Sequence, residues 1–323
     1  MERVNRLKEI YRTIDGGTAK DKINNLPKFP KIIEFEVTNH CNFQCLMCKT
    51  GMATSTRERG YMKDETFHAV INEIKDYPVA LKFVGQGEPD LHPKLMEYIR
   101  IAKENGIIVH LTTNGSLLDE SKLAELIDAE LDSIKFSFQG VDAEGYKQLR
   151  QKDNYEELLN KIELLYKLRG DKEFPYITVG TSVTSESEEK VAAFRKRCEH
   201  ICDKVEVGIT TLEFIDLDRI KSKEARNEIE KIQGHQNRIK QRYVCCPQIF
   251  DTIAVRWNGD ITACCADLDG VMTLGNIKSK NILECWNSPM ENKYREILSK
   301  CEYDKLELCK DCYDVYGWSY GTN

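Results

Sequence analysis

The first two thirds of the chain alternate between two spacings of apolar residues. The runs Ile32 to Val37 and Val79 to Val84 are predominantly apolar, which is typical of buried strands. Between them, Asp64 to Asp76 carries an apolar residue at every third or fourth position, as an amphipathic helix does. The pattern predicts a strand, then a helix, then a second strand.

The same alternation continues downstream. Further strands are predicted at Ile107 to Leu111, Ser133 to Phe138, Tyr176 to Val183 and Val205 to Ile209, and further helices at Pro93 to Glu104, Ser121 to Asp128, Tyr155 to Leu168 and Glu188 to His200. Six strands that alternate with helices pair in parallel through right-handed crossovers. The sequence therefore predicts an α/β fold, and its periodicity fits a partial barrel as well as an open sheet.

The residues with chemical potential follow the predicted strands directly. Cys41, Gly85, Thr113, Gln139 and Thr184 each come just after a strand ends. In parallel folds the active groups gather at the carboxyl ends of the strands. We therefore expect one face of the fold to collect these loops.

The composition changes between Asp218 and Arg242, where lysine and arginine outnumber glutamate. We interpret residues 218–242 as a charged linker or solvated helix rather than a basic lid over an anionic substrate. It separates a domain of residues 32–217 from a smaller domain of residues 243–323, and residues 1–31 form an N-terminal extension. In the smaller domain, Asn258-Gly259 between two apolar runs predicts a hairpin, and a helix over Ile282 to Leu298 is interrupted near Pro289.

Length, composition and charge narrow the function classes. The chain has 323 residues, of which 41% are hydrophobic, and a formal charge of -6 spread over short mixed runs, which disfavours nucleic acid as the main partner. Neither a long apolar span nor a signal peptide is present, so no membrane partner is expected and the predicted location is cytoplasmic. Thirteen cysteines without an export signal indicate metal or redox chemistry rather than disulfides.

Three cysteines stand close together directly after the first predicted strand, as Cys41-x3-Cys45-x2-Cys48. A structural zinc site takes four ligands, which His40 would complete. Three thiolates also suit an iron-sulfur cluster that leaves one iron open to bind another molecule. The spacing alone permits both.

This triplet, together with Gly85-Gln86-Gly87-Glu88-Pro89 after the second strand, resembles the radical S-adenosylmethionine (SAM) superfamily. The resemblance implies a partial (β/α)6 barrel with a 4Fe-4S cluster on Cys41, Cys45 and Cys48, and SAM bound at the open iron. Gln86 stands where the family has glycine, and Met47 where it usually has an aromatic residue. The residues that the resemblance assigns to SAM are Gln86, Gly87, Glu88, Thr113, Asn114, Ser137 and Arg150.

The C-terminal domain offers a second set of four thiolates. They are Cys246, Cys264, Cys309 and Cys312. Their arrangement resembles the auxiliary-cluster domains of SPASM and twitch type, which implies a second 4Fe-4S cluster, although a zinc ribbon also takes four cysteines. The spacing is similar to that in twitch-domain cyclitol dehydrogenases, which oxidise a secondary alcohol to a ketone.

The resemblance implies an oxidoreductase that takes a hydrogen atom from a carbon of a sugar, cyclitol or sugar nucleotide, with flavodoxin or ferredoxin as electron donor. The outcome is dehydrogenation, or epimerisation if a thiol such as Cys245 or Cys265 returns a hydrogen atom. Maturation of a ribosomal peptide is the alternative within enzymes, and a non-catalytic module stabilised by metal is the alternative outside them. The remaining cysteines, Cys198, Cys202, Cys285 and Cys301, are expected to be mostly buried small hydrophobic residues.

Overall fold

The computed structural model describes residues 3–14, 19–212, 215–235, 241–242, 246, 248–310, 312 and 316–317. Its strands are β1 (Ile32–Phe35), β2 (Ala80–Phe83), β3 (Ile108–Thr113), β4 (Ser133–Ser137), β5 (Tyr176–Val183), β6 (Lys204–Ile209), β7 (Gln241–Arg242), β8 (Thr252–Val255), β9 (Asp260–Thr262), β10 (Thr273–Asn276) and β11 (Tyr316–Gly317). Its α-helices are α1 (Leu7–Ile14), α2 (Ala19–Asn24), α3 (Asp64–Ile74), α4 (Leu95–Glu104), α5 (Glu120–Asp128), α6 (Ala143–Arg150), α7 (Tyr155–Arg169), α8 (Glu188–Cys198), α9 (Lys223–His235), α10 (Ile282–Trp286) and α11 (Pro289–Ser299).

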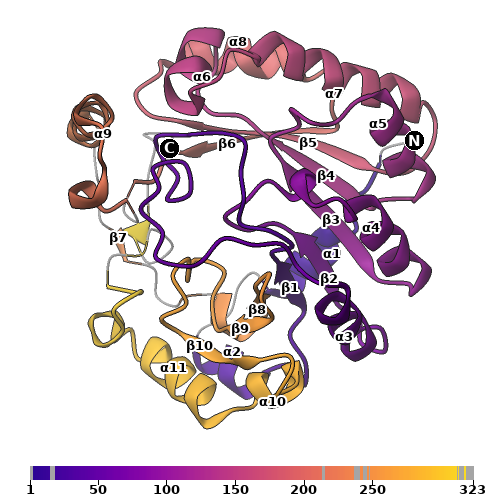
Figure 1. The fold of residues 1–323 in the computed structure, drawn as a ribbon, viewed down its shortest axis with the longest axis vertical. Helices are drawn as coiled ribbons and strands as arrows, with labels where there is room; N and C mark the ends of the chain where they lie inside the picture. The colour runs from indigo at the N-terminus through magenta and orange to yellow at the C-terminus, as the bar shows by residue number, and fades with distance from the viewer. Residues whose placement is uncertain are drawn as a thin grey trace.

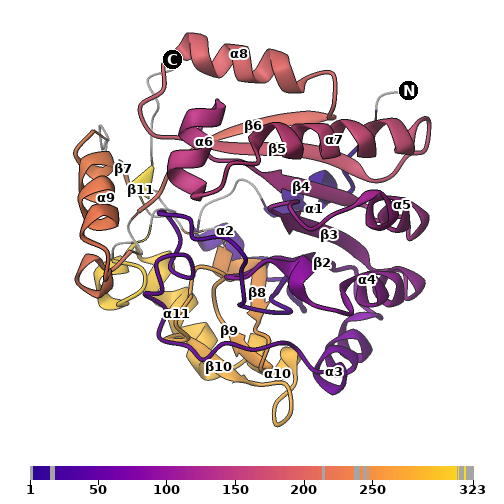
Figure 2. The ribbon, with the colours of Figure 1, turned by 45° about the horizontal axis from the view of Figure 1, so that its top comes forward.

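Nine strands form one curved sheet in the order β10-β9-β8-β1-β2-β3-β4-β5-β6. The strands β1 to β6 pair in parallel with consecutive neighbours, which confirms the predicted α/β alternation. Helices α3, α4, α5, α7 and α8 lie along the outside of this sheet (Figures 1 and 2). The C-terminal helices α10 and α11 lie near the end of the sheet that β10 forms. Among the described residues, no helix has the length and apolar character needed to span a bilayer.

The predicted hairpin of the C-terminal segment is not a separate sheet. Its first strand, β8, pairs in parallel with β1, in the register Ile32 to Thr252 and Phe35 to Val255. Its second strand, β9, pairs antiparallel with β8 and with β10. The first strand of the barrel therefore has a neighbour on both sides, and the C-terminal segment extends the sheet of the N-terminal one.

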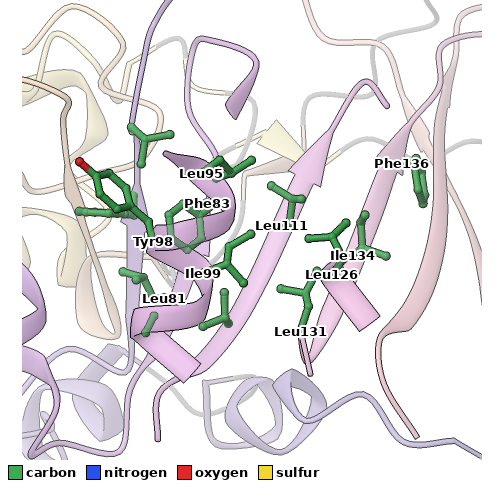
Figure 3. Packing of buried hydrophobic residues seen from close by; sticks show 14 of the residues in the cluster. Leu81, Phe83, Leu95, Tyr98, Ile99, Leu111, Leu126, Leu131, Ile134 and Phe136 are labelled. Atoms are coloured by element: carbon green, nitrogen blue, oxygen red, sulfur yellow. The ribbon is translucent and has the colours of Figure 1, made fainter. Parts of the chain in front are cut away.

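The core lies between the sheet and the outer helices. Leu81 and Phe83 of β2, Leu111 of β3 and Phe136 of β4 are all fully buried against the helices. Figure 3 shows Leu81 and Phe83 beside Tyr98 and Ile99 of α4, while Phe136 lies farther along the sheet. Burial of this size stabilises a side chain by about 1.5 to 3 kcal/mol, so this layer accounts for much of the stability of the fold.

The opposite, concave face of the same strands is charged. Glu34, Lys82 and His110 are register partners on β1, β2 and β3, between the apolar residues that point to the helices. Lys82 pairs with Glu34 at 2.5 Å, and Lys135 of β4 pairs with Glu206 of β6 at 2.8 Å. Side chains alternate between the two faces along a strand. The apolar residues of each run therefore pack against the outer helices, and the polar residues between them face the concave side of the sheet.

Candidate active site

The loop after β1 folds tightly around Cys45. A Cβ at Gly51 would lie 2.4 Å from the carbonyl oxygen and 2.6 Å from the nitrogen of Cys45, so only glycine lets the chain return this closely. The backbone N–H of Cys48 donates to the carbonyl of Cys45 at 3.2 Å. Cys45 is buried, while Cys41 and Cys48 are partly buried.

The three thiols of this loop are electrostatic neighbours. Burial, with smaller contributions from the nearby Glu88, Cys48 and Cys45, raises the pKa of Cys41 to about 12 against the opposing backbone hydrogen bond at Phe43. Burial likewise raises the pKa of Cys45, against the opposing effect of Arg150. Thiols in such a setting become thiolates only beside bound cations, so the donor set suits a cluster that displaces their protons.

His40, the fourth ligand that zinc would need, is occupied in another way. Its ring stacks on Tyr61 with 4.6 Å between ring centroids and 16° between the planes. Within the described ranges, no three histidine, cysteine or acidic side chains converge closely enough to hold a single metal ion. The carbonyl of His40 instead accepts the backbone N–H of Glu88 at 2.8 Å.

That bond places the Gly85–Pro89 loop directly against the cysteine loop. A Cβ on Gly87 would lie 2.3 Å from the carbonyl oxygen of Thr38 and 2.5 Å from that of His40. The position therefore requires glycine, because a Cβ there would collide with backbone atoms of the cysteine loop, which cannot move aside as a flexible side chain could. Two of the strand-end loops that the sequence assigned to SAM are in contact.

Glu88 gathers the next strand end as well. Its carboxylate accepts hydrogen bonds from the hydroxyl of Thr113 at 2.6 Å and from the backbone N–H of Asn114 at 2.7 Å. It also accepts from the N–H of Asp90 at 3.2 Å. Burial raises the pKa of Glu88 to about 7, although these donors oppose the shift. Thr113 and Asn114 are thus brought to Glu88, and Oε2, which accepts one of these three hydrogen bonds, retains a further lone pair.

Gln86 points toward the C-terminal segment. Its side-chain oxygen accepts from Thr50 at 3.3 Å, and its amide nitrogen donates to the carbonyl of Leu268. Its backbone N–H donates to Glu36 at 3.2 Å. The residue that departs from the family's glycine therefore connects three segments of the chain.

Arg150 is anchored on the protein itself. It ends α6, and its Nη2 donates to the carbonyl oxygens of Ser137 at 2.6 Å and Phe138 at 3.3 Å. Its Nη1 lies 3.6 Å from the sulfur of Cys45, and its buried Nε has no hydrogen-bond partner among the described residues. Ser137 contributes its backbone carbonyl to this contact.

The C-terminal cysteines also converge. Cys246, Cys309 and Cys312 belong to one buried cluster with Phe250 and Tyr303. The thiol of Cys264 has Cys246 and Cys312 as electrostatic neighbours, so the four predicted ligands lie in one region of the fold, although within the described residues they are not close enough together to hold a single metal ion. Their donor set, buried and free of disulfides, suits a second iron-sulfur cluster. Cys245, the other predicted hydrogen donor, lies outside the described residues.

A cavity of about 390 Å³ is lined by Cys48 of the first cysteine set and by Cys265, which directly follows Cys264. Its wall includes Cys48, Gln86, Cys265, Glu34, Lys82 and Arg256. Glu34 and Lys82 are also the electrostatic neighbours of the Cys265 thiol. Burial, followed by the charges of Lys82 and Lys135, lowers the pKa of His110 well below its usual value, so this neighbour is neutral. Sequence reasoning missed these charged groups, although each interrupts an apolar strand and was visible as such.

Comparison with known proteins agrees with this geometry. The family model described as the Radical SAM superfamily matches residues 35–197, and the SPASM iron-sulfur cluster-binding domain matches residues 245–313. The tungsten-containing aldehyde ferredoxin oxidoreductase cofactor-modifying protein of Pyrococcus furiosus is 24% identical over 328 residues, 87% of each chain. The PqqA peptide cyclase of Gluconobacter oxydans is 32% identical, but over 38% of this chain and 34% of its own length.

Solved structures show the same fold. SuiB from Streptococcus suis, bound to S-adenosylmethionine, superimposes with a TM-score of 0.68 at 19% identity, over 94% of this chain and 76% of SuiB. BtrN in complex with AdoMet and 2-DOIA superimposes with a TM-score of 0.57 at 17% identity, over 88% and 93% of the two chains. These likenesses confirm the predicted fold class, a parallel α/β barrel domain followed by an iron-sulfur domain.

Proposed function

Because the chain belongs to the radical SAM superfamily and ends in a SPASM iron-sulfur domain, we propose that it is an oxidoreductase acting on a small polyhydroxylated substrate. The substrate class is a sugar, cyclitol or sugar nucleotide. The observation that carries this proposal is the cavity lined by Cys48 and Cys265, with Glu34 and Lys82 in its wall. A flavodoxin or ferredoxin supplies the electrons.

The family implies 4Fe-4S clusters and SAM as cofactors, and we assign the first cluster to Cys41, Cys45 and Cys48. Once bound there with SAM, this cofactor pair supplies a 5′-deoxyadenosyl radical, which removes a hydrogen atom from a substrate carbon. We assign the binding of SAM to the loops of Gly87 and Asn114 and to Nε of Arg150, which has no hydrogen-bond partner in the part of the chain that the structure describes. The protein keeps the reacting carbon beside SAM and away from water.

The size and polarity of the cavity support a small polar substrate. Its volume of about 390 Å³ lies at the lower end of the range for small-molecule sites, which is about 300 to 1,000 Å³. Glu34 accepts and Lys82 donates hydrogen bonds, so the pair matches hydroxyl groups on neighbouring carbons. An apolar substrate that covered this ion pair would cost free energy, because buried charges need polar partners.

Two fates of the substrate radical fit this wall. In dehydrogenation, the hydroxyl proton passes to the carboxylate of Glu34 and one electron leaves for an iron-sulfur acceptor, which gives a ketone. In epimerisation, the Cys265 thiol donates a hydrogen atom to the opposite face of the carbon. The resulting sulfur radical then takes up one electron from the reduced flavodoxin or ferredoxin and one proton from water. The place of Cys265 in the cavity wall supports the second fate.

A second candidate is modification of a peptide. It is favoured by the relatives named PqqA peptide cyclase and by the solved structure of SuiB bound to its precursor peptide SuiA. A peptide would enter through the open part of the cavity with one side chain inside. Its test is part of the same experiment.

The experiment incubates reduced enzyme and SAM in deuterated water with host metabolite fractions or host peptides. One carbon-bound deuterium in a small product supports epimerisation, and a product two mass units lighter supports dehydrogenation. Cys265→Ala should abolish the deuterated product while SAM cleavage continues, and Cys301→Ala, which alters an exposed cysteine, should change nothing. Cys45→Ala should abolish SAM cleavage and keep the iron of the auxiliary site. A product found only among the peptides would overturn the small-substrate proposal.

A further inference from the structure

The loop that follows Cys264 lies directly on the segment that follows Cys48. We call residues 264–272 the auxiliary loop and residues 49–57 the first-cluster segment. Asp269 of the auxiliary loop pairs with Lys49 and accepts the backbone N–H of Thr56 at 2.9 Å and the hydroxyl of Ser55 at 3.3 Å. One carboxylate therefore contacts three residues of the first-cluster segment.

The residue before Asp269 makes a second set of contacts through its backbone. The carbonyl of Leu268 accepts from Nε of Arg57 at 2.7 Å and from the side-chain amide of Gln86. Arg57 also binds Glu36 with two hydrogen bonds of 2.9 and 2.7 Å, an arrangement that fixes its orientation. The auxiliary loop is thus bonded to the first-cluster segment and to the loop that follows β2.

The auxiliary loop has a shape fixed from within. Asp267 is fully buried, and its carboxylate accepts the backbone N–H groups of Gly270, Val271 and Met272 at 2.8 to 3.0 Å. Arg256 of the β8–β9 turn donates to the carbonyl oxygens of Cys264, Cys265 and Asp267. Because the loop is held by so many hydrogen bonds, it is rigid, and a displacement of Cys264 also displaces Asp269.

We propose that Asp269 is a positioning residue for SAM binding, through which the auxiliary loop holds the first-cluster segment in its binding shape. Lys49 directly follows the ligand Cys48, and Thr50 bonds Gln86, so a shift of this segment displaces both sides of the SAM site. The state of the auxiliary site therefore governs the affinity of the first site for SAM. This coupling is independent of which substrate the cavity takes.

The test compares the loaded protein with Asp269→Ala, which removes the contacts to Lys49, Ser55 and Thr56 together. We expect unchanged total iron and a SAM dissociation constant raised about tenfold, measured by titration of the reduced cluster's electron paramagnetic resonance signal. Asp269→Asn keeps an oxygen for Thr56 and should fall between the two. Glu296→Gln, which breaks an exposed ion pair with Lys300 in the same domain, is the matched control and should bind SAM normally.

A second measurement does not depend on the clusters' activity. Hydrogen exchange in unreduced protein should show the amide of Thr56 exchanging at least about tenfold faster in Asp269→Ala, together with its neighbours in residues 49–57. Lys49→Met should reproduce the loss of SAM affinity. Equal SAM affinity and equal Thr56 exchange in Asp269→Ala would overturn the proposal. Loss of iron from both sites would overturn it too, because Asp269 would then serve folding rather than positioning.

Discussion

At the scale of single residues, Arg150 joins the sheet to the first cysteine loop. Its Nη2 is held by two carbonyls at the end of β4, while its Nη1 reaches the sulfur of Cys45 at 3.6 Å. The neighbouring N–H of Leu46 donates to the carbonyl of Leu149, so the loop is tied to the end of α6 twice. A donor or positive charge beside a ligand sulfur favours the reduced, more negative form of a cluster.

Arg150→Met should therefore lower the reduction potential of the first cluster. Loss of one charge-assisted hydrogen bond, about 1.5 kcal/mol, corresponds to a shift of roughly 60 mV for one electron. Spectroscopic redox titration of the loaded protein measures it. Lys152→Met is the control, because it also removes one positive charge beside the cysteine loop. Lys152 lies over the ring of Phe43, 5.7 Å from its centroid, and not against the sulfur of Cys45. Equal shifts in both variants would mean that general charge, not the contact with Cys45, sets the potential.

Glu291 of α11 makes the stability of the protein depend on pH. It is fully buried, its two oxygens lack hydrogen-bond partners among the described residues, and Arg295 lies 3.3 Å away. Tyr294 and Cys285 are its other titratable neighbours. Burial raises its pKa from 4.5 to about 8, against the opposing charge of Arg295.

Because the folded protein holds this proton more tightly than the unfolded chain, stability should fall as pH rises from about 4.5 through about 8. At about 1.4 kcal/mol per pKa unit, the wild type should lose on the order of 2 kcal/mol more than Glu291→Gln between pH 6 and pH 9. Anaerobic urea unfolding at both pH values measures the difference. Parallel losses in the two proteins would contradict the assignment.

At the scale of elements, the close approach of two loops depends on one glycine. Gly87→Ala would place a Cβ 2.3 Å from the carbonyl oxygen of Thr38, so the two loops must separate. We expect a loss of about 1 to 3 kcal/mol of stability and about half of the bound iron, with the auxiliary site intact. Gly208→Ala on β6, where the nearest atom is 3.6 Å away, is the control. Iron analysis decides, and a fully loaded Gly87→Ala would refute the argument.

The elements also show where sequence reasoning succeeds and where it ends. The apolar runs of β1 to β5 and their helices were predicted within a few residues, because these strands are largely buried, and β6 was also predicted although none of its residues is buried. Helix α6 was missed because only Tyr146 and Leu149 of its eight residues are buried. Strand β10 was missed because it is four residues long with Leu274 as its one apolar residue, and a bulge interrupts its pairing.

The candidate site was predictable for its ligands and not for its walls. Cysteine spacing predicts both candidate metal sites, because ligand chemistry restricts residue type and distance along the chain. The contacts of Gln86 with Leu268 and of Arg150 with Cys45 join residues 182 and 105 positions apart. No local pattern carries such information, since it arises from the packing of the finished sheet.

At the scale of the whole molecule, one sheet connects both parts of the chain. Since β8 pairs with β1 over four residues, the barrel and the C-terminal segment share a ladder of backbone hydrogen bonds. Unfolding should therefore be a single transition in the loaded protein. Tryptophan fluorescence, which reports Trp257, Trp286 and Trp318, and far-ultraviolet circular dichroism should give coincident urea curves. An earlier fluorescence midpoint would show that the C-terminal segment unfolds alone.

The pairing of β1 with β8 also limits how the protein can be dissected. A fragment ending at residue 217 would contain the whole first-cluster loop but would leave one edge of β1 without its partner. An exposed, flat, apolar strand edge is a template for pairing with other chains. Such a fragment should self-associate on expression, as light scattering would show, whereas the intact chain stays monodisperse. Gene fusions and truncations of this enzyme should therefore keep both segments in one polypeptide.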